Sequence, residues 1–174
     1  MKKLFDVSLR ASAFASMLAL AACGAERQAA TTLESRSGSS TTGTANFQED
    51  GDPVTLTLVV SGATPGKHGA HIHETGDCGA ADASSAGAHW NPTSKSHGLP
   101  DADHHLGDLG NIEIGQDGKG TLTLSKTAWK IGDGSANDVV GKAVVIHAAA
   151  DDLVTDPAGN SGSRVACGVI TRSE

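Results

Sequence analysis

The sequence has little positive charge, few aromatic side chains and no helical periodicity. Lysine and arginine number 13 against 20 aspartate and glutamate residues, so the formal net charge is −7. An acidic chain without a basic patch or a phosphate-cradling glycine-rich loop is a poor candidate for binding nucleic acid. Aromatic residues make up 3% of the chain and tyrosine is absent. Because no segment sustains a helical period, an α-helical fold is not predicted either.

The N-terminus has the pattern of an export signal. Three positive residues precede an apolar run over residues 11–22, which is too short to span a bilayer as a mature helix. The run ends in Leu20-Ala-Ala-Cys23, which resembles a bacterial lipobox, in which the cysteine is lipidated after cleavage. The alternative is an ordinary signal peptide with a chance cysteine. Gly24 follows the cysteine and favours the outer membrane over the inner one.

These features divide the chain into three parts. We predict a lipoprotein signal peptide over residues 1–22, a lipid-anchored tether over residues 23–29 and one folded domain over residues 30–174. The protein is then exported to the periplasm and anchored to a membrane through Cys23. Cleavage leaves 152 residues, and the loss of three cations and one anion changes the net charge to −9.

The cysteine count agrees with this division. Three cysteines are an odd number for an exported protein. If Cys23 carries lipid, Cys78 and Cys167 remain, and an oxidising compartment favours pairing them. Two separate reduced thiols are the alternative.

Short β-rich segments predict an all-β sandwich or barrel. The strongest is Val54-Thr-Leu-Thr-Leu-Val-Val60, with residues in partial alternation. A glycine-rich turn over residues 115–120 predicts a hairpin. Two long loops, 73–108 and 148–164, separate the strands and need a functional reason to be ordered. The other predicted strands are 31–35, 70–73, 111–114, 121–124, 139–148 and 165–171.

The eight histidines all lie between His68 and His147. Histidine is the commonest metal ligand in proteins, and this density indicates more than one metal ion. His71 and His73 alternate in a predicted strand, so they share one face about 7 Å apart. His147 ends another predicted strand and can supply a third imidazole. Such an imidazole-rich site suits copper or zinc.

A second group lies in the first long loop. His89, His97 and His105 have seven residues between each successive pair, and Asp108 follows. Three imidazoles and a carboxylate make a closed tetrahedral site, the usual zinc arrangement. The alternative is a histidine-rich solvated loop. Two histidines fall outside both patterns and are predicted not to bind metal: His68 and His104.

With these residues in place, the sequence resembles the copper/zinc superoxide dismutase family over nearly all of the predicted domain. Each fragment alone is moderate evidence, but their joint order is very specific. The resemblance implies a Greek-key, immunoglobulin-like β-sandwich or barrel whose two long loops are a metal-binding loop and an electrostatic loop. The matching fragments are Gly69-Ala-His71-Ile-His73-Glu74, Ala88-His89-Trp-Asn-Pro92, His97-Gly98, His105-Leu-Gly-Asp108-Leu-Gly-Asn111, Val144-Val-Ile-His147, Ala150-Asp-Asp-Leu153 and Gly162-Ser-Arg164-Val-Ala-Cys167-Gly-Val-Ile170.

The resemblance also implies one copper and one zinc ion per subunit, with His89 as a bridge between them. Asp151 would bond a copper ligand, His71, and a zinc ligand, His97, and Arg164 would lie near copper. Cys78 and Cys167 would form a disulfide. The implied copper ligands are His71, His73, His89 and His147. The implied zinc ligands are His89, His97, His105 and Asp108.

The implied activity is dismutation of superoxide to O₂ and H₂O₂, by copper that cycles between Cu(II) and Cu(I) beside a structural zinc. His89 and Arg164 would be the catalytic residues. The loop after Asp152 is shorter than in animal members and has no lysine matching theirs. A periplasmic copper/zinc buffer or carrier without turnover is the main alternative, and a structural or adhesion sandwich is another. Family members occur as monomers and as homodimers, and the sequence does not choose between these states.

Overall fold

Antiparallel β-strands form nearly all the regular structure of this protein. The computed structural model describes residues 26–101 and 103–173, so the predicted signal peptide and the predicted lipidation site, Cys23, lie outside the described residues. Within the described ranges the only helical element is a 3₁₀ turn at Ser84–Ala86. No helix in that part of the chain is long and apolar enough to cross a bilayer. The strands are β1 (Arg27–Ser35), β2 (Thr42–Glu49), β3 (Val54–Ser61), β4 (Gly66–His73), β5 (Asp108–Ile114), β6 (Lys119–Lys126), β7 (Ala143–His147), β8 (Arg164–Val169) and β9 (Thr171–Arg172).

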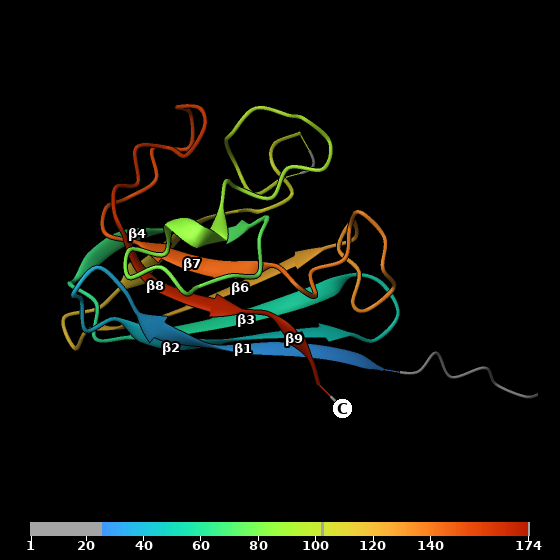
Figure 1. Cartoon of the computed structure of the whole chain (residues 1–174), viewed down its shortest axis with the longest axis horizontal. Coiled ribbons are helices and arrows are strands. Elements are labelled where there is room, and N and C mark those ends of the chain that lie inside the picture. Colours follow the sequence, from blue (N-terminus) through green and yellow to red (C-terminus); the bar gives the residue numbers. More distant parts are fainter. Residues whose placement is uncertain (1–25, 102, 174) are drawn as a thin grey trace, which may run out of the picture.

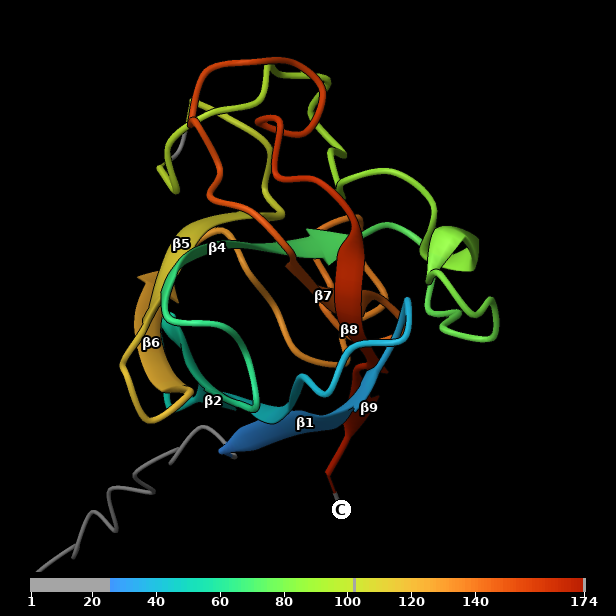
Figure 2. The same cartoon turned by 90° about the vertical axis from the view of Figure 1, so that its left-hand side faces the viewer.

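The strands curl into a nearly closed barrel, as the sequence predicted. The hydrogen-bonded order is β5-β4-β7-β8-β1-β2-β3-β6, and β9 pairs with β1. Because β4 pairs with β7 rather than with β3, chain segments far apart in sequence become neighbours. Figure 2 looks toward one end of the barrel and shows the strands encircling a common interior.

The core fills this interior, and in β3 it does so through alternation of buried and more exposed side chains along the strand. In β3, Val54, Leu56, Leu58 and Val60 are fully buried while the residues between them are more exposed. Trp129 packs edge-on against a phenylalanine of β2 and fills the centre of the same core. This burial is the main force that holds the barrel together.

The predicted disulfide is confirmed. Cys78 and Cys167 are bonded, and both are buried in a small apolar cluster outside the main core. The bond joins the long loop after β4 to strand β8, across 89 residues of sequence.

Several element boundaries differ from the sequence prediction. Strand β2 was not predicted, because Thr-Gly-Thr-Ala-Asn-Phe-Gln-Glu is mostly polar; it is held by full-length pairing to β1 and β3. Strand β1 begins at Arg27, so the predicted domain start at residue 30 lies inside a strand and residues 27–29 belong to the sheet rather than to a tether. Strand β7 begins at Ala143 rather than at residue 139.

The predicted hairpin over residues 111–124 forms only at its turn. Gly115 and Lys119 close the turn with a backbone hydrogen bond of 2.8 Å. In the described part of the chain, however, β5 pairs along its length with β4 and β6 with β3, and no ladder joins β5 to β6. The two strands are therefore the two edges at which the barrel nearly closes.

The two long loops lie on the same side of the barrel. Residues 74–107 connect β4 to β5, and residues 148–163 connect β7 to β8. In both views the later part of the first loop rises together with the second loop above β4 and β7, whereas the earlier part, with the 3₁₀ turn, lies beside β8 (Figures 1 and 2). They contact each other, since the backbone N–H of His97 donates to Asp156 Oδ1 at 2.6 Å. The histidines that the sequence analysis singled out gather beneath these loops.

Candidate metal centre

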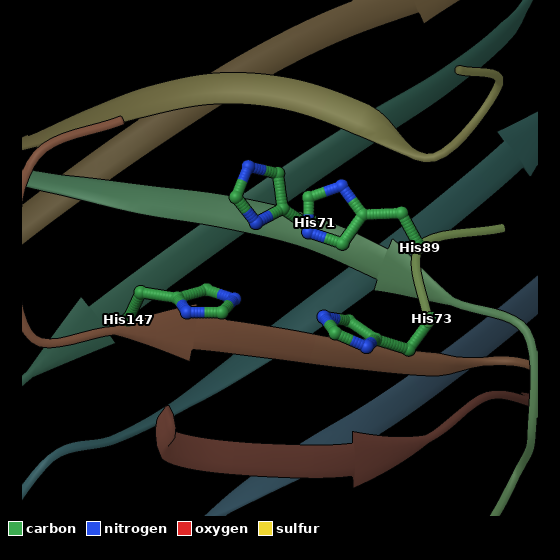
Figure 3. A group of neighbouring side chains, drawn as sticks. All are labelled: His71, His73, His89 and His147. Atoms are coloured by element: carbon green, nitrogen blue, oxygen red, sulfur yellow. The ribbon is translucent and has the colours of Figure 1, made fainter. Parts of the chain in front are cut away.

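Strands β4 and β7 place three of the predicted histidines together. His71 and His73 share one face of β4, and β7 runs antiparallel beside it and ends at His147. His89 joins them from the loop, through an isolated bridge with His73. Figure 3 shows the four rings gathered over β4 and β7. One nitrogen from each residue lies within 4.8 Å of the others.

The nitrogens that face this group have no hydrogen-bond partner. They are buried, and an unsatisfied buried polar atom costs about 1–3 kcal/mol. Four such atoms converging at one point fit the coordination of a metal ion, for which neutral imidazoles are the natural ligands. The four atoms are His71 Nδ1, His73 Nε2, His89 Nε2 and His147 Nε2.

A second group surrounds the carboxylate of Asp108, which is fully buried at the start of β5. Asp108 Oδ1 lies 3.0 Å from His89 Nδ1, 3.0 Å from His97 Nδ1 and 3.4 Å from His105 Nδ1. Three imidazoles thus lie around one carboxylate, a donor set of the kind that a tetrahedral zinc ion takes.

His71 also lies close to this second group. Its ring centroid is 3.9 Å from that of His89, and its donor atom falls within 4.8 Å of those of His89, His97 and Asp108. The two nitrogens of His71 are nevertheless committed elsewhere, since Nε2 bonds Asp151 and Nδ1 faces the first group. The His105 Nδ1, which is buried, has no hydrogen-bond partner and lies 3.4 Å from Asp108 Oδ1, is then the further imidazole nitrogen that faces the second group.

His89 belongs to both groups. Its Nδ1 is directed at Asp108 Oδ1, and its Nε2 is one of the four unpartnered nitrogens of the first group. One ring thus offers a ligand atom to each of two adjacent metal positions.

Asp151 connects the two groups from outside. Its Oδ2 lies 2.8 Å from His71 Nε2 and its Oδ1 lies 2.9 Å from His97 Nε2. Asn111 holds the aspartate in turn, because its side-chain amide donates to the Asp151 carbonyl at 2.9 Å and accepts from the Asp151 N–H at 2.7 Å. The sequence analysis quoted Asn111 only as part of a motif and missed this role.

Two further histidines of the first group are held by backbone carbonyls. His73 Nδ1 bonds Gly87 O at 3.0 Å and His147 Nδ1 bonds Gly162 O at 3.1 Å. His68, predicted not to bind metal, lies outside both groups and bonds the His147 carbonyl at 2.7 Å. It therefore positions a candidate ligand, a role that its place in the sequence did not reveal.

Arg164 lies beside the first group. It pairs with His147 across β7 and β8, and its guanidinium donates to Ala83 O and to Gly87 O, both at 2.7 Å. Gly87 O is the same carbonyl that His73 bonds. The arginine side chain is thus fixed near the candidate ligands, and the Asp82 carboxylate is close enough to act on its charge.

Burial favours the neutral form of the first-group imidazoles. It lowers the pKa of His73 to about 2 and that of His147 to about 4, and it lowers the pKa of His71 and His89 as well. His97 differs: burial acts to lower its pKa, but the hydrogen bond to Asp151 and the nearby carboxylate charges outweigh this and raise it. A neutral, desolvated ring is ready to bind a metal ion without first losing a proton.

The fold and the two groups define a β-barrel protein with two adjacent clusters of side chains that could each hold a metal ion. The family model for copper/zinc superoxide dismutase (SODC) matches residues 41–170, three quarters of the chain. The chain therefore belongs to the copper/zinc superoxide dismutase family. The two metals in the name of this family are the two that the donor sets fit.

Proposed function

We propose that this protein is a superoxide dismutase that binds one copper ion in the first group and one zinc ion in the second. The observation that carries the proposal is His89, whose two ring nitrogens face the two groups. A metal buffer needs ligands but has no need for a shared ring. The family membership of the chain supports the same reaction, 2 O₂•⁻ + 2 H⁺ → O₂ + H₂O₂.

When bound, copper would supply one-electron chemistry by cycling between Cu(II) and Cu(I), and zinc would supply a fixed positive charge. His89 can take up a proton at Nε2 while its Nδ1 stays directed toward Asp108. A proton on Nε2 faces the first group, where superoxide would be reduced. His89 would therefore act as the general acid that protonates the product oxygen. Asp151 fixes the orientation of His71 and His97, so that the other nitrogen of each ring faces one of the two groups, where it would bind the metal.

Arg164 attracts the anionic substrate. The chain as a whole carries a net charge of −7, so attraction of superoxide has to come from local positive charge. The guanidinium is half-buried and held beside His73 and His147, which is where such a charge acts most strongly.

The test is metal analysis joined to a superoxide assay on the reconstituted protein. We expect one copper and one zinc per chain with rapid turnover. Bound metal without turnover would instead favour the buffer or carrier function. Arg164→Ala should lower turnover and flatten its salt dependence while the metal content stays the same. Arg36→Ala is the matched control, since Arg36 also donates to a carbonyl of the same long loop, that of Cys78, and should leave the kinetics unchanged.

We also propose that the mature protein begins at a lipidated Cys23, is exported to the periplasm and is anchored through that cysteine to the outer membrane. This rests on the sequence pattern of residues 1–24 alone. Mass spectrometry of the membrane fraction should find an acylated N-terminal cysteine. Cys23→Ser should release an active protein into the soluble fraction, whereas a Cys23→Ser protein that stays membrane-bound would refute the anchor.

A further inference from the structure

Strand β6 ends in a buried cation that belongs to neither metal group. Lys126 is 8% exposed, and its Nζ donates to two backbone carbonyls, Leu106 O at 3.3 Å and Asp108 O at 2.9 Å. Burying an ammonium group is costly unless the group is hydrogen-bonded, so the burial of Lys126 needs a physical or functional reason.

Trp129 reinforces the same contact. Its indole N–H donates to Leu106 O at 3.1 Å, and the Lys126 ammonium lies 5.4 Å from the centre of its ring, within range of a cation–π attraction. Trp129 is itself fully buried in the main core. Two donors anchored on the barrel thus hold the short segment from Leu106 to Asp108.

That segment contains the carboxylate of the second metal group. It follows His105 directly and ends at Asp108, the two ligands nearest to each other in sequence. On the β4 side the ladder register shifts between Gly69 and His71, opposite Asp108, and Gly107 holds the segment there by accepting from the Ile72 N–H at 2.8 Å and donating to Trp90 O at 2.9 Å. On the other side no ladder joins β5 to β6 in the described part of the chain. The side chain of Lys126 bridges this gap between the two edges of the barrel.

We propose that Lys126, supported by Trp129, is a positioning residue for the second metal. By holding the carbonyls of Leu106 and Asp108, it keeps the Asp108 carboxylate and the His105 ring directed toward His89 and His97. The inference rests on the proposed function, in which this group binds zinc. A lysine that only stabilises the barrel would not affect the two metal groups differently.

The test compares three lysine variants by metal binding rather than by activity. Lys126→Met removes the donors and keeps the length, and Lys126→Arg keeps donors. Lys142→Met is the matched control, because Lys142 also lies over an indole ring, that of Trp90, at 5.8 Å. Zinc affinity is measured by competition with a chelator, copper affinity likewise, and the geometry of the second group by the visible absorption of Co²⁺ added as a zinc probe.

We expect Lys126→Met to weaken zinc binding by about 10- to 100-fold, as loss of an outer-sphere contact does, and to change the Co²⁺ spectrum. Copper affinity should change much less, Lys126→Arg should recover most of the loss, and Lys142→Met should match the wild type. Equal weakening of both metals, or wild-type zinc affinity and Co²⁺ spectrum in Lys126→Met, would overturn the inference. Absence of zinc and Co²⁺ binding in the wild type would overturn the proposed function instead. If Lys126→Met does not fold, Trp129→Phe, which removes only the indole donor, should still weaken zinc binding selectively, and wild-type zinc affinity in that variant would overturn the inference.

Discussion

Acid should destabilise the metal-free protein steeply, because its first-group imidazoles are held neutral by burial. The pKa of His73 is lowered to about 2 and that of His147 to about 4. In the unfolded chain a histidine titrates near pH 6.5, at about its ordinary pKa. Below that pH the unfolded chain takes up protons that the folded chain does not, so the stability contributed by these groups is present above about pH 6.5 and is lost as the pH falls.

The size of the effect follows from the two values. Between pH 7 and pH 5, each of His73 and His147 lowers the free energy of unfolding by about 2 kcal/mol, or about 4 kcal/mol together. His71 and His89 act in the same direction, because burial lowers their pKa too, whereas the raised pKa of His97 acts against them. Since domains are stable by only about 5–15 kcal/mol, this change is large enough to measure easily.

The assay is urea unfolding of the metal-free, disulfide-bonded protein at pH 7, 6 and 5. Tryptophan fluorescence reports it, since Trp90 and Trp129 are both buried. His73→Gln should reduce the pH slope between pH 7 and pH 5 by about 1 kcal/mol per pH unit. His104→Gln is the control and should keep the slope, because His104 lies outside both groups and bonds Asp101 near the surface. A free energy of unfolding that is equal at pH 7 and pH 5 would refute the reasoning.

Three further predictions concern the supports of the site. Asp151→Asn should weaken binding at both groups by about 10- to 100-fold in chelator competition, because one carboxylate bonds an imidazole of each; wild-type affinities would contradict this. Gly159→Ala should abolish zinc binding, since its Cβ would collide with the Asp151 carboxylate, whereas Gly134→Ala, at a similar positive φ but in open space, should cost only about 1–2 kcal/mol of stability in urea unfolding and keep zinc. Equal zinc affinities would exclude the collision. Replacing Cys78 and Cys167 by serine should lower the free energy of unfolding by about 2–5 kcal/mol, seen as a lower Tm, and an unchanged Tm would exclude a stabilising disulfide.

The prediction of the fold succeeded where local pattern is strong and failed where pairing decides. The alternation of Val54, Leu56, Leu58 and Val60 identifies a strand because only that period buries four apolar side chains on one face. Strand β2 has no such signal, since among its eight residues only Ala45, Phe47 and Glu49 are buried. It is a strand because β1 and β3 lie on either side and bond its backbone, which is a tertiary effect.

The candidate ligands could be read from the sequence because metal chemistry restricts residue type and spacing. Imidazoles and one carboxylate at regular intervals have few other uses, and a strand sets His71 and His73 on one face whatever surrounds them. The partners that hold these residues could not be read in the same way. Nothing in the sequence near His68, Asn111 or Lys126 indicates that their side chains bond backbone carbonyls of residues 79, 40 and 18 positions away.

The sequence alone thus determined the kind of chemistry: which residues can bind metal, and that a β-barrel carries them. Only the tertiary structure decided how they are arranged. Pairing of β4 with β7 brings His147 beside His71 and His73, and the packing of two loops turns the two nitrogens of His89 toward different groups. The physical reason is that residue identity sets which atoms can be ligands, whereas the direction of each lone pair depends on hydrogen bonds made by distant parts of the chain.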